Sequence, residues 1–414
     1  MAQAFLEVTV NPTFTAALLC WILGGAALGS VSGLIPGLHA NNFALLLAGV
    51  APSVPGPTLF VGCAMLSAGV VHTFLNAVPA MALGVPDAEM AVTALPGHQL
   101  VLEGRGFEAI RLSAVGSLLA VLVAIPLAIP VTAAVTAVYP QLRANLSVLL
   151  VVIVLALVLS ESTWRRRFAG LFSFSLAATL GWATLDLSPD APLEAGGMLA
   201  PLFAGLFGAP VLIDAVRGGG VPPQGGTILR MSRPLLLVTA VAGALSGAVV
   251  GYLPGISAAI AAVAVLVVLP GGATARSYIV ATSGVDTANT IFALFALVAI
   301  GQPRSGVMVA FQRVDAPLEL PILLSGIVLA GVIGFALVIV VGDAYLELVG
   351  RLEYWRISAA VLSMLVCLAF LFAGPIGVLT FGVATVVGLV PVRLQARRVH
   401  LMGVLIGPLA LAGL

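Results

Sequence analysis

The chain has 414 residues, of which 61% are hydrophobic and 8% are charged, and its formal net charge is +1. Soluble domains carry about 25% charged residues, so this composition excludes a soluble globular protein, and the balanced charge gives no reason to expect nucleic acid as a partner. Apolar runs of about 20 residues recur along the whole chain, which predicts an all-α polytopic membrane protein with about 10–12 transmembrane segments.

A Pro-Gly pair interrupts the first apolar region. Residues 13–35 predict one full span, and Pro36 and Gly37 then break the helix within apolar sequence. The next apolar stretch, residues 38–51, is too short to cross a bilayer alone. We expect a re-entrant half-helix here, because interrupted backbone at membrane depth is tolerated only where protein or a water-filled cavity satisfies it.

Polar side chains gather at the tip of this half-helix. His39, Asn41 and Asn42 fall in its first turn, directly after Leu38. Backbone N–H groups and the positive end of the helix dipole lie at the same place, so the tip predicts an anion-binding site. In the alternative interpretation, Asn41 and Asn42 only cap the broken helix.

The rest of the first half combines interrupted and full apolar segments. Residues 58–84 form an apolar segment with a proline interruption, and residues 85–111 are polar. His72 and Asn76 lie four residues apart in the first of these and therefore share one helix face. A Gly- and Pro-rich connector, residues 217–233, ends this half. The spans expected before the connector cover residues 112–138, 145–160, 168–187 and 196–216.

The second half repeats the pattern of the first. Residues 243–255 match residues 25–37 at seven of thirteen positions, including four glycines and the Pro-Gly pair. Glycines four residues apart lie on one helix face and allow another backbone to approach closely in lipid. A second half-helix is therefore expected over residues 255–269. The residues at its tip are Pro254, Gly255 and Ser257.

Polar residues also occur inside the apolar segment 277–300, which is expected to be broken. Asp286, Thr287 and Asn289 lie in this segment, and we assign them with His72 and Asn76 to a site for a coupling ion or a proton. A carboxylate at membrane depth needs a compensating partner, which makes it a functional candidate. The alternative is an aspartate that caps a broken helix. The segments expected after it are the polar stretch 302–319 and spans over 320–342, 357–373, 375–390 and 401–414.

The matching blocks predict two homologous units, residues 1–216 and 234–414, joined by the connector 217–233. Arginine-rich helix ends are expected to face the cytoplasm, and counting spans between them makes the two units antiparallel. Such inverted repeats with paired interruptions mark the binding sites of secondary transporters. We therefore expect a small anionic substrate between the two half-helix tips, near the bilayer midplane.

Charged residues follow the matching prolines of the two units. Asp87 and Glu89 follow Pro86, whereas Arg304 follows the equivalent Pro303. Opposite charges at equivalent positions suggest a gate or a salt bridge between the units. The alternative is that these are solvated loop charges.

Several of these blocks resemble the TctA family, the large permease subunit of tripartite tricarboxylate transporters. The resemblance rests on the glycine ladder that ends in Pro-Gly, on GVPDAEMAVTALPGHQLVLEGRG at residues 84–106 and on SGVDTANT at residues 283–290. The short chain, whose basic residues are all arginine, is most similar to the archaeal-type branch. This resemblance implies an ion-coupled permease for carboxylate or tricarboxylate anions in a prokaryotic cell membrane, driven by H⁺ or Na⁺. It also implies a small membrane subunit and an extracytoplasmic binding protein as partners.

Two rival functions stay open at this point. Half-helix tips would also suit a phosphate headgroup, so the alternative is a flippase or transporter for a phosphate-bearing lipid or another anionic metabolite. An intramembrane enzyme would need a nucleophile within hydrogen-bond reach of His72, and the sequence shows no such motif. The three cysteines and four histidines lack metal-ligand spacing, so we expect no catalytic site, metal or other cofactor. The sequence does not decide whether the chain forms a homo-oligomer.

Overall fold

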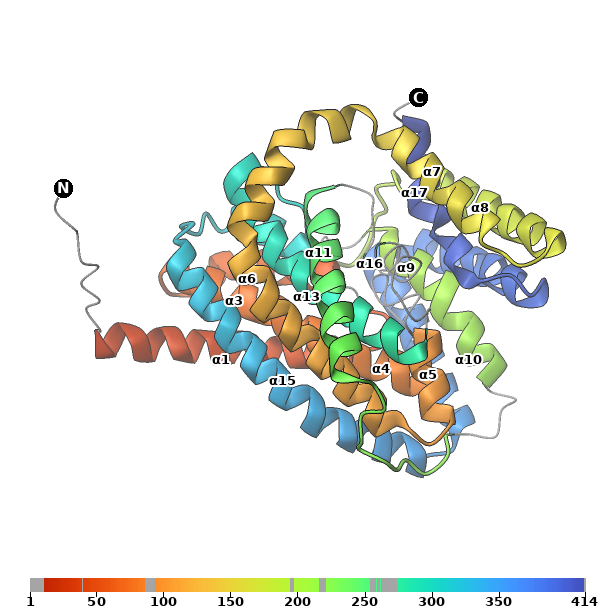
Figure 1. The fold of residues 1–414 in the computed structure, drawn as a ribbon, viewed down its shortest axis with the longest axis horizontal. Helices are drawn as coiled ribbons and strands as arrows, with labels where there is room; N and C mark the ends of the chain where they lie inside the picture. The colour runs from red at the N-terminus through yellow and green to blue at the C-terminus, as the bar shows by residue number, and fades with distance from the viewer. Residues whose placement is uncertain are drawn as a thin grey trace.

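The computed structural model describes residues 11–38, 40–85, 94–193, 197–215, 221–253, 258, 261 and 274–412. Within these residues, seven helices are long and apolar enough to cross a membrane. Three shorter apolar helices, Leu146–Leu159, Leu199–Ile213 and Arg398–Leu411, lie where the sequence predicted further spans. The prediction of an all-α polytopic membrane protein is confirmed (Figure 1).

Most of the long helices form what we call the central bundle. It consists of α1 (Pro12–Leu34), α3 (Thr58–Leu75), α4 (Ala77–Leu83), α6 (Gly106–Ala144), α11 (Arg233–Tyr252), α13 (Ala275–Ile300) and α15 (Leu320–Arg351). Three short helices pack at its edges: α2 (Ala40–Val50), α5 (Ala94–Leu102) and α14 (Gly306–Arg313).

A second set of helices packs beside the central bundle, and we call it the lateral group. It consists of α7 (Leu146–Leu159), α8 (Trp164–Thr184), α9 (Leu199–Phe203), η2 (Ala204–Gly208), α10 (Ala209–Ala215), α16 (Tyr354–Arg393), η3 (Arg398–Met402) and α17 (Gly403–Ala412). Figure 1 shows α6 arching over the top of the molecule into α7, with α7, α8 and α17 together at the right. Helix α16 is kinked at Ala373 and Gly374, and its first half contacts the central bundle.

Glycines bring the backbones of α1 and α3 into direct contact. A Cβ atom on Gly25 would lie 2.1 Å from the Ala64 carbonyl oxygen, and one on Gly29 would lie 2.3 Å from that of Ala68. The order of contacts is the same on both helices, so α1 and α3 run parallel. Because they follow each other in the sequence, the chain must return between them. Helix α2, with 11 residues, lies on this return path, as the predicted half-helix requires.

The same packing recurs in the second half of the chain. A Cβ atom on Gly243 would lie 2.6 Å from the Ala281 carbonyl oxygen, and one on Gly247 would lie 2.8 Å from that of Val285. These positions follow their counterparts in α1 and α3 by 217 or 218 residues. Helices α11 and α13 therefore form a parallel pair equivalent to α1 and α3.

The two parallel pairs point in opposite directions. Helix α13 begins beside Glu108, to which Arg276 donates a hydrogen bond of 2.9 Å. Helix α3 begins at the opposite end of the bundle, where Gly62 packs against Phe311 of α14, the helix that follows α13. These directions agree with inverted repeats. For the two complete units, the inverted relation stays a prediction.

The expected break within residues 277–300 is wrong, because α13 is one continuous helix of 26 residues. The segment contains no proline, and its polar residues fit within the helical pattern. Thr282, for example, donates to the Tyr278 carbonyl oxygen at 2.6 Å, a bond that satisfies the hydroxyl without opening the helix. Asp286 therefore lies in the middle of an intact helix and does not cap a broken one.

One end of the central bundle is held by ion pairs. The carboxylate of Glu108 is fully buried, where it accepts hydrogen bonds from Arg276, from the Arg230 backbone N–H at 2.7 Å and from Arg105. Arg111 of α6 forms two hydrogen bonds of 2.8 and 2.9 Å to the Asp343 carboxylate of α15. Several arginines thus gather at one end of the bundle, and its orientation toward the cytoplasm stays a prediction.

A similar carboxylate fastens the lateral group. Glu161, between α7 and α8, accepts hydrogen bonds from Arg397 Nε at 2.9 Å and His400 Nε2 at 3.0 Å. Burial raises the pKa of Glu161, but the hydrogen bonds from Arg397 and His400 lower it more, so the pKa lies below its ordinary value. The loop between α7 and α8 is thereby tied to the chain that follows α16.

The glycine contacts predict a sharp difference in stability between substitutions at two glycines of α1. Gly29→Ala should destabilise the protein by about 1–3 kcal/mol, because the added methyl group meets backbone that has no room to move. Gly24→Ala is the matched control, since nothing lies within 4 Å of its Cβ position. Thermal unfolding of both purified variants measures the difference. Equal stability of the two would contradict close packing of α1 on α3.

Candidate functional site

The tip of α2 lies between the central bundle and the lateral group. Gly37, just before this tip, has a φ of +75°, and a Cβ atom there would lie 2.7 Å from the side chain of Leu365 in α16. Leu38 is buried in one cluster with Ala200 of α9 and Phe372 of α16. The Pro-Gly interruption therefore brings the start of a half-helix to the boundary between the two sets of helices.

Asn42 is the described polar side chain at this tip. It is 4% exposed, and its amide nitrogen has no hydrogen-bond partner among the residues that the structure describes. A buried donor without a partner costs about 1–3 kcal/mol, so this position calls for an acceptor. Of the other residues predicted for the anion site, His39, Pro254, Gly255, Ser257 and the side chain of Asn41 lie outside the described part.

His72 connects three helices beside the tip. Its Nδ1 atom lies 2.9 Å from Ser32 Oγ of α1, and its ring stacks on Phe43 of α2 with centroids 6.3 Å apart. The Ser32 hydroxyl therefore lies within hydrogen-bond reach of His72, as a nucleophile of an intramembrane enzyme would have to. The Ser32 hydroxyl also lies 3.1 Å from the Gly29 carbonyl oxygen in its own helix, to which it donates. The pair thus serves as an interhelical contact between α1 and α3.

Two of the hydrogen bonds between the first half of the chain and the second lie next to the joint between α3 and α4. Asn76, at the joint between α3 and α4, donates from Nδ2 to Asp286 Oδ2 at 2.9 Å. The hydroxyl oxygens of Thr73 and Thr287 lie 3.2 Å apart. All four side chains are buried. Residues that the sequence analysis assigned to one site from separate segments are thus in direct contact.

Serines extend this contact to α6. Ser113 Oγ lies 2.8 Å from Ser283 Oγ, and Ser117 donates to the Ser283 carbonyl oxygen at 3.2 Å. Asn289 lies on α13 and is also buried. We call the following residues the polar cluster: Ser32, His72, Thr73, Asn76, Ser113, Ser117, Ser283, Asp286 and Thr287.

Sequence reasoning missed Ser32, Ser113 and Ser117. Each lies in a span that it treated as purely apolar packing. The signal that could have found them is their spacing: Ser113 and Ser117 lie four residues apart on one face, and Ser32 adjoins a glycine of the ladder.

Arg304 lies at the end of the bundle where α13 stops. It donates to the Tyr139 hydroxyl and to Gln302 Oε1 at 2.9 Å, and its guanidinium lies 5.6 Å from the centre of the Tyr139 ring. Asp87 and Glu89, its predicted counterparts, lie outside the described residues. The gate or salt bridge between them stays a prediction.

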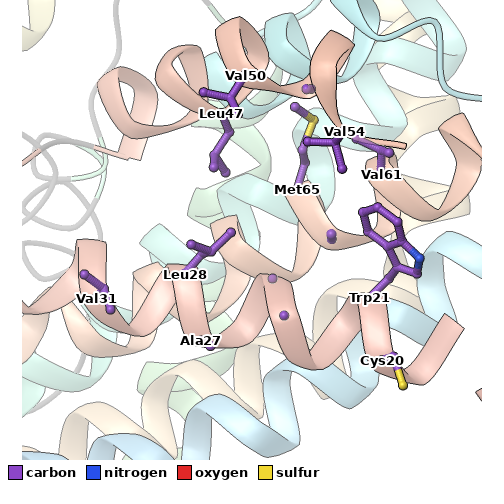
Figure 2. Close-up of a pocket in the computed structure, with 14 residues that line it drawn as sticks. Cys20, Trp21, Ala27, Leu28, Val31, Leu47, Val50, Val54, Val61 and Met65 are labelled. Carbon is purple, nitrogen blue, oxygen red and sulfur yellow. The ribbon is translucent and has the colours of Figure 1, made fainter. Parts of the chain in front are cut away.

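An apolar groove of about 570 Å³ lies next to the half-helix but apart from the polar cluster. Figure 2 shows Trp21 and Leu28 of α1 on one side, with Leu47 and Val50 of α2 and Met65 of α3 facing them. The described residues that line it include no charged side chain. Its chemistry suits a hydrocarbon chain and not a carboxylate.

Comparison with known proteins identifies the family. The model of the tripartite tricarboxylate transporter TctA family matches residues 19–403. The chain belongs to this family. It is also 26% identical over 400 residues to an uncharacterised protein of Methanocaldococcus jannaschii, an alignment that covers 94% of this chain and 97% of the relative. No solved structure matches the chain.

Membership of the TctA family confirms the resemblance seen in the sequence. It makes the chain a component of a tricarboxylate transport system and indicates a transporter, not an enzyme. Together with the seven long apolar helices, it indicates a multi-pass membrane protein. Members of the family typically function in tripartite systems, together with other subunits.

The contact between Asn76 and Asp286 predicts the outcome of a side-chain exchange. Asn76→Asp alone should lower stability, because two carboxylates then lie together in a buried place. Combining it with Asp286→Asn should restore most of the loss, with a coupling energy of about 0.5–3 kcal/mol. Thermal unfolding of the two single variants and the double variant measures this coupling. Additive losses would show that the two side chains do not interact.

Proposed function

We propose that this TctA-family chain is an ion-coupled secondary transporter that carries carboxylate anions, tricarboxylates among them, across a prokaryotic cell membrane. The observation that supports this most directly is the buried amide nitrogen of Asn42 at the start of α2, which has no hydrogen-bond partner among the described residues. A carboxylate oxygen would accept a hydrogen bond from this nitrogen. The positive end of the α2 dipole would favour the same charge.

The substrate would lie between the two half-helix tips. One tip comprises Pro36, Gly37, Leu38 and the asparagines that follow, and the other comprises Pro254, Gly255 and Ser257. The first tip adjoins both the central bundle and the lateral group. A relative movement of these two sets of helices would therefore open the site first to one side of the membrane and then to the other.

Coupling would depend on the polar cluster, with Asn289 next to it. Asp286 is a carboxylate at the centre of a helix in the middle of the bundle, and it contacts Asn76 from the other half. A cation or a proton bound there would compensate the carboxylate. His72 of the polar cluster stacks on Phe43 of α2. Ion or proton binding that rearranges the cluster would therefore shift α2 and with it the substrate tip.

The proposed transporter has further partners. Arg304, with Asp87 and Glu89 as the opposite charges, would act as a gate at the end of α13. A small membrane subunit and an extracytoplasmic binding protein would complete the system, as the description of the family implies.

A lipid flippase is the second candidate, and the apolar groove favours it. The groove lies against α2, so a phosphate at the half-helix tip could extend a hydrocarbon tail along α1. We rank it below carboxylate transport because the family match concerns tricarboxylate transport.

Substitution of Asn42 tests the anion site. Asn42→Asp keeps the shape of the side chain but repels an anion, and Asn42→Ala removes the donor. We expect uptake of radiolabelled di- and tricarboxylates into proteoliposomes to fall by roughly 10- to 150-fold for Asn42→Ala, the effect of losing a hydrogen bond to a charged group worth about 1.5–3 kcal/mol. Asn42→Asp should abolish uptake.

Asn145→Ala is the control for this experiment, since Asn145 is an exposed asparagine directly after α6 whose side chain donates to the Gln141 carbonyl oxygen within the same turn. It should transport normally. Normal uptake by both Asn42 variants would remove the anion-site assignment.

Filling the groove separates the two candidate functions. Gly24 lines the groove and Gly49 of α2 does not, and at neither position does an atom lie within 4 Å of an added Cβ. A leucine at position 24 would extend into the groove, and one at position 49 would not. In the proposed function, carboxylate uptake by Gly24→Leu and Gly49→Leu is about equal. A flippase would instead lose lipid transfer selectively in Gly24→Leu, and a fluorescent-phospholipid scrambling assay in the same proteoliposomes measures it.

A further inference from the structure

Two exposed tryptophans mark the ends of α8, which lies at the outer edge of the lateral group (Figure 1). Trp164 is 79% exposed and Trp182 is 69% exposed. They are 18 residues apart, which is about five helical turns, so both side chains leave the same face of α8. The same spacing is about 27 Å along the axis, close to the thickness of the hydrocarbon core. Because tryptophans are enriched where membrane meets water, we place Trp164 and Trp182 at the levels of the two headgroup layers.

The two ends of α8 carry opposite charges. Residues 165–167, directly after Trp164, are all arginine, whereas Asp186 and Asp190 follow Trp182. The ion pairs formed between described residues do not include any of these three arginines. An anionic headgroup is therefore attracted to the Trp164 end of the helix and repelled from the Trp182 end.

Arg167 is held against the ring of Trp164. Its guanidinium lies 4.9 Å from the centre of that ring, and its Nε donates to the Glu161 carbonyl oxygen at 3.1 Å. The carboxylate of Glu161 is buried and accepts hydrogen bonds from Arg397 and His400. A guanidinium fixed in this way can offer its outer N–H groups to a phosphate, which arginine binds with two parallel hydrogen bonds.

An apolar groove of about 410 Å³ lies on the same face of α8, between this helix, α7 and α17. Phe174, which lines it, is seven residues after Arg167, about 10 Å along the axis. The exposed apolar side chains of Phe168 and Leu171 cover the face between them. The two hydroxyl groups in the groove donate to carbonyl oxygens of α8 itself. A hydrocarbon chain attached to a phosphate at Arg167 can therefore lie along this face and enter the groove.

We propose that the Trp164 end of α8 binds an anionic phospholipid, with the phosphate on Arg167 and a hydrocarbon chain in the groove. Arg165 and Arg166 are exposed and add to the attraction for the headgroup. A second copy of the chain fits this face less well, because a symmetric contact would bring two sets of arginines together. The bound lipid would hold the lateral group at a fixed level in the bilayer. The inference does not rest on the proposed function, since it requires no substrate.

Native mass spectrometry of the purified full chain tests the site. The protein is titrated with phosphatidylglycerol or with phosphatidylcholine of the same acyl chains. Wild-type protein should bind phosphatidylglycerol at least about tenfold more tightly, because each arginine near the headgroup favours the anionic lipid. Arg167→Gln should reduce this preference about fivefold, and replacing all three arginines with glutamine should abolish it. Glycerol phosphate, which has the phosphate but no tail, should not displace the lipid.

Arg356→Gln is the matched control. Arg356 also lies over an exposed tryptophan, with its guanidinium 5.5 Å from the centre of the Trp355 ring, but it forms an ion pair of 3.0 Å with Glu353. This variant should keep the wild-type preference for phosphatidylglycerol. If Arg167→Gln does not fold, the double variant Arg165→Gln and Arg166→Gln, which changes only exposed side chains, takes its place and should lower the preference.

Four results would overturn the proposal: equal binding of the two lipids, an unchanged preference in the triple variant, displacement of the lipid by glycerol phosphate, or a dimer in place of a lipid adduct. Displacement would show a phosphate site without a role for the groove, and a dimer would assign this face to a second copy. A lipid preference in protein that takes up no carboxylate would contradict the proposed function and leave the lipid site intact. Carboxylate uptake without any lipid preference would do the opposite.

Discussion

The close contact between the backbones of α1 and α3, repeated between α11 and α13, constrains the rest of the bundle. In lipid there is little hydrophobic force between helices, so their association depends on packing, and small residues allow the closest packing. Gly25 and Gly29 place α1 directly against the carbonyl groups of α3. Two such helices, parallel and consecutive in sequence, must be joined by a segment that returns the chain to the side where the first helix began. The half-helix α2 and its polar tip lie on this returning segment.

A contribution to stability does not explain why the polar cluster lies inside the bundle. Hydrogen bonds between membrane helices contribute about 0.6 kcal/mol on average, whereas a buried polar group left without a partner costs about 1–3 kcal/mol. If apolar residues replaced Thr73, Asn76, Asp286 and Thr287, the bundle would lose little stability. It would also bury no polar group that could be left without a partner. The position of these four residues between the two halves therefore argues for a role in function, since packing alone does not require them.

The sequence predicted the features that depend on local signals. Glycines four residues apart and a Pro-Gly pair indicate close packing and interruption wherever they occur, so α2 was expected. The contacts of Asn76 with Asp286 and of Thr73 with Thr287 could not be predicted as pairs, because they depend on how α3 crosses α13. Polar residues in α13 were mistaken for a break, although no proline interrupts this helix. Ser113 and Ser117 were missed because hydroxyl groups in apolar helices usually bond within their own helix.

The two halves share the packing of a parallel helix pair, but they carry different polar residues at equivalent positions. At the shift of 217 residues, His72 corresponds to Asn289, Asn76 to Ala293 and Asp286 to Gly69, which packs against Val307. The carboxylate thus occurs in one half only, and the half-helix tip rich in asparagine occurs in the other. In the proposed mechanism, one half binds the anion and the other supplies the ligand that attracts the cation. Carrying both together reduces the net charge that must cross a medium in which an unpaired charge costs several kcal/mol. Unequal halves therefore suit the transport of a highly charged anion better than identical halves would.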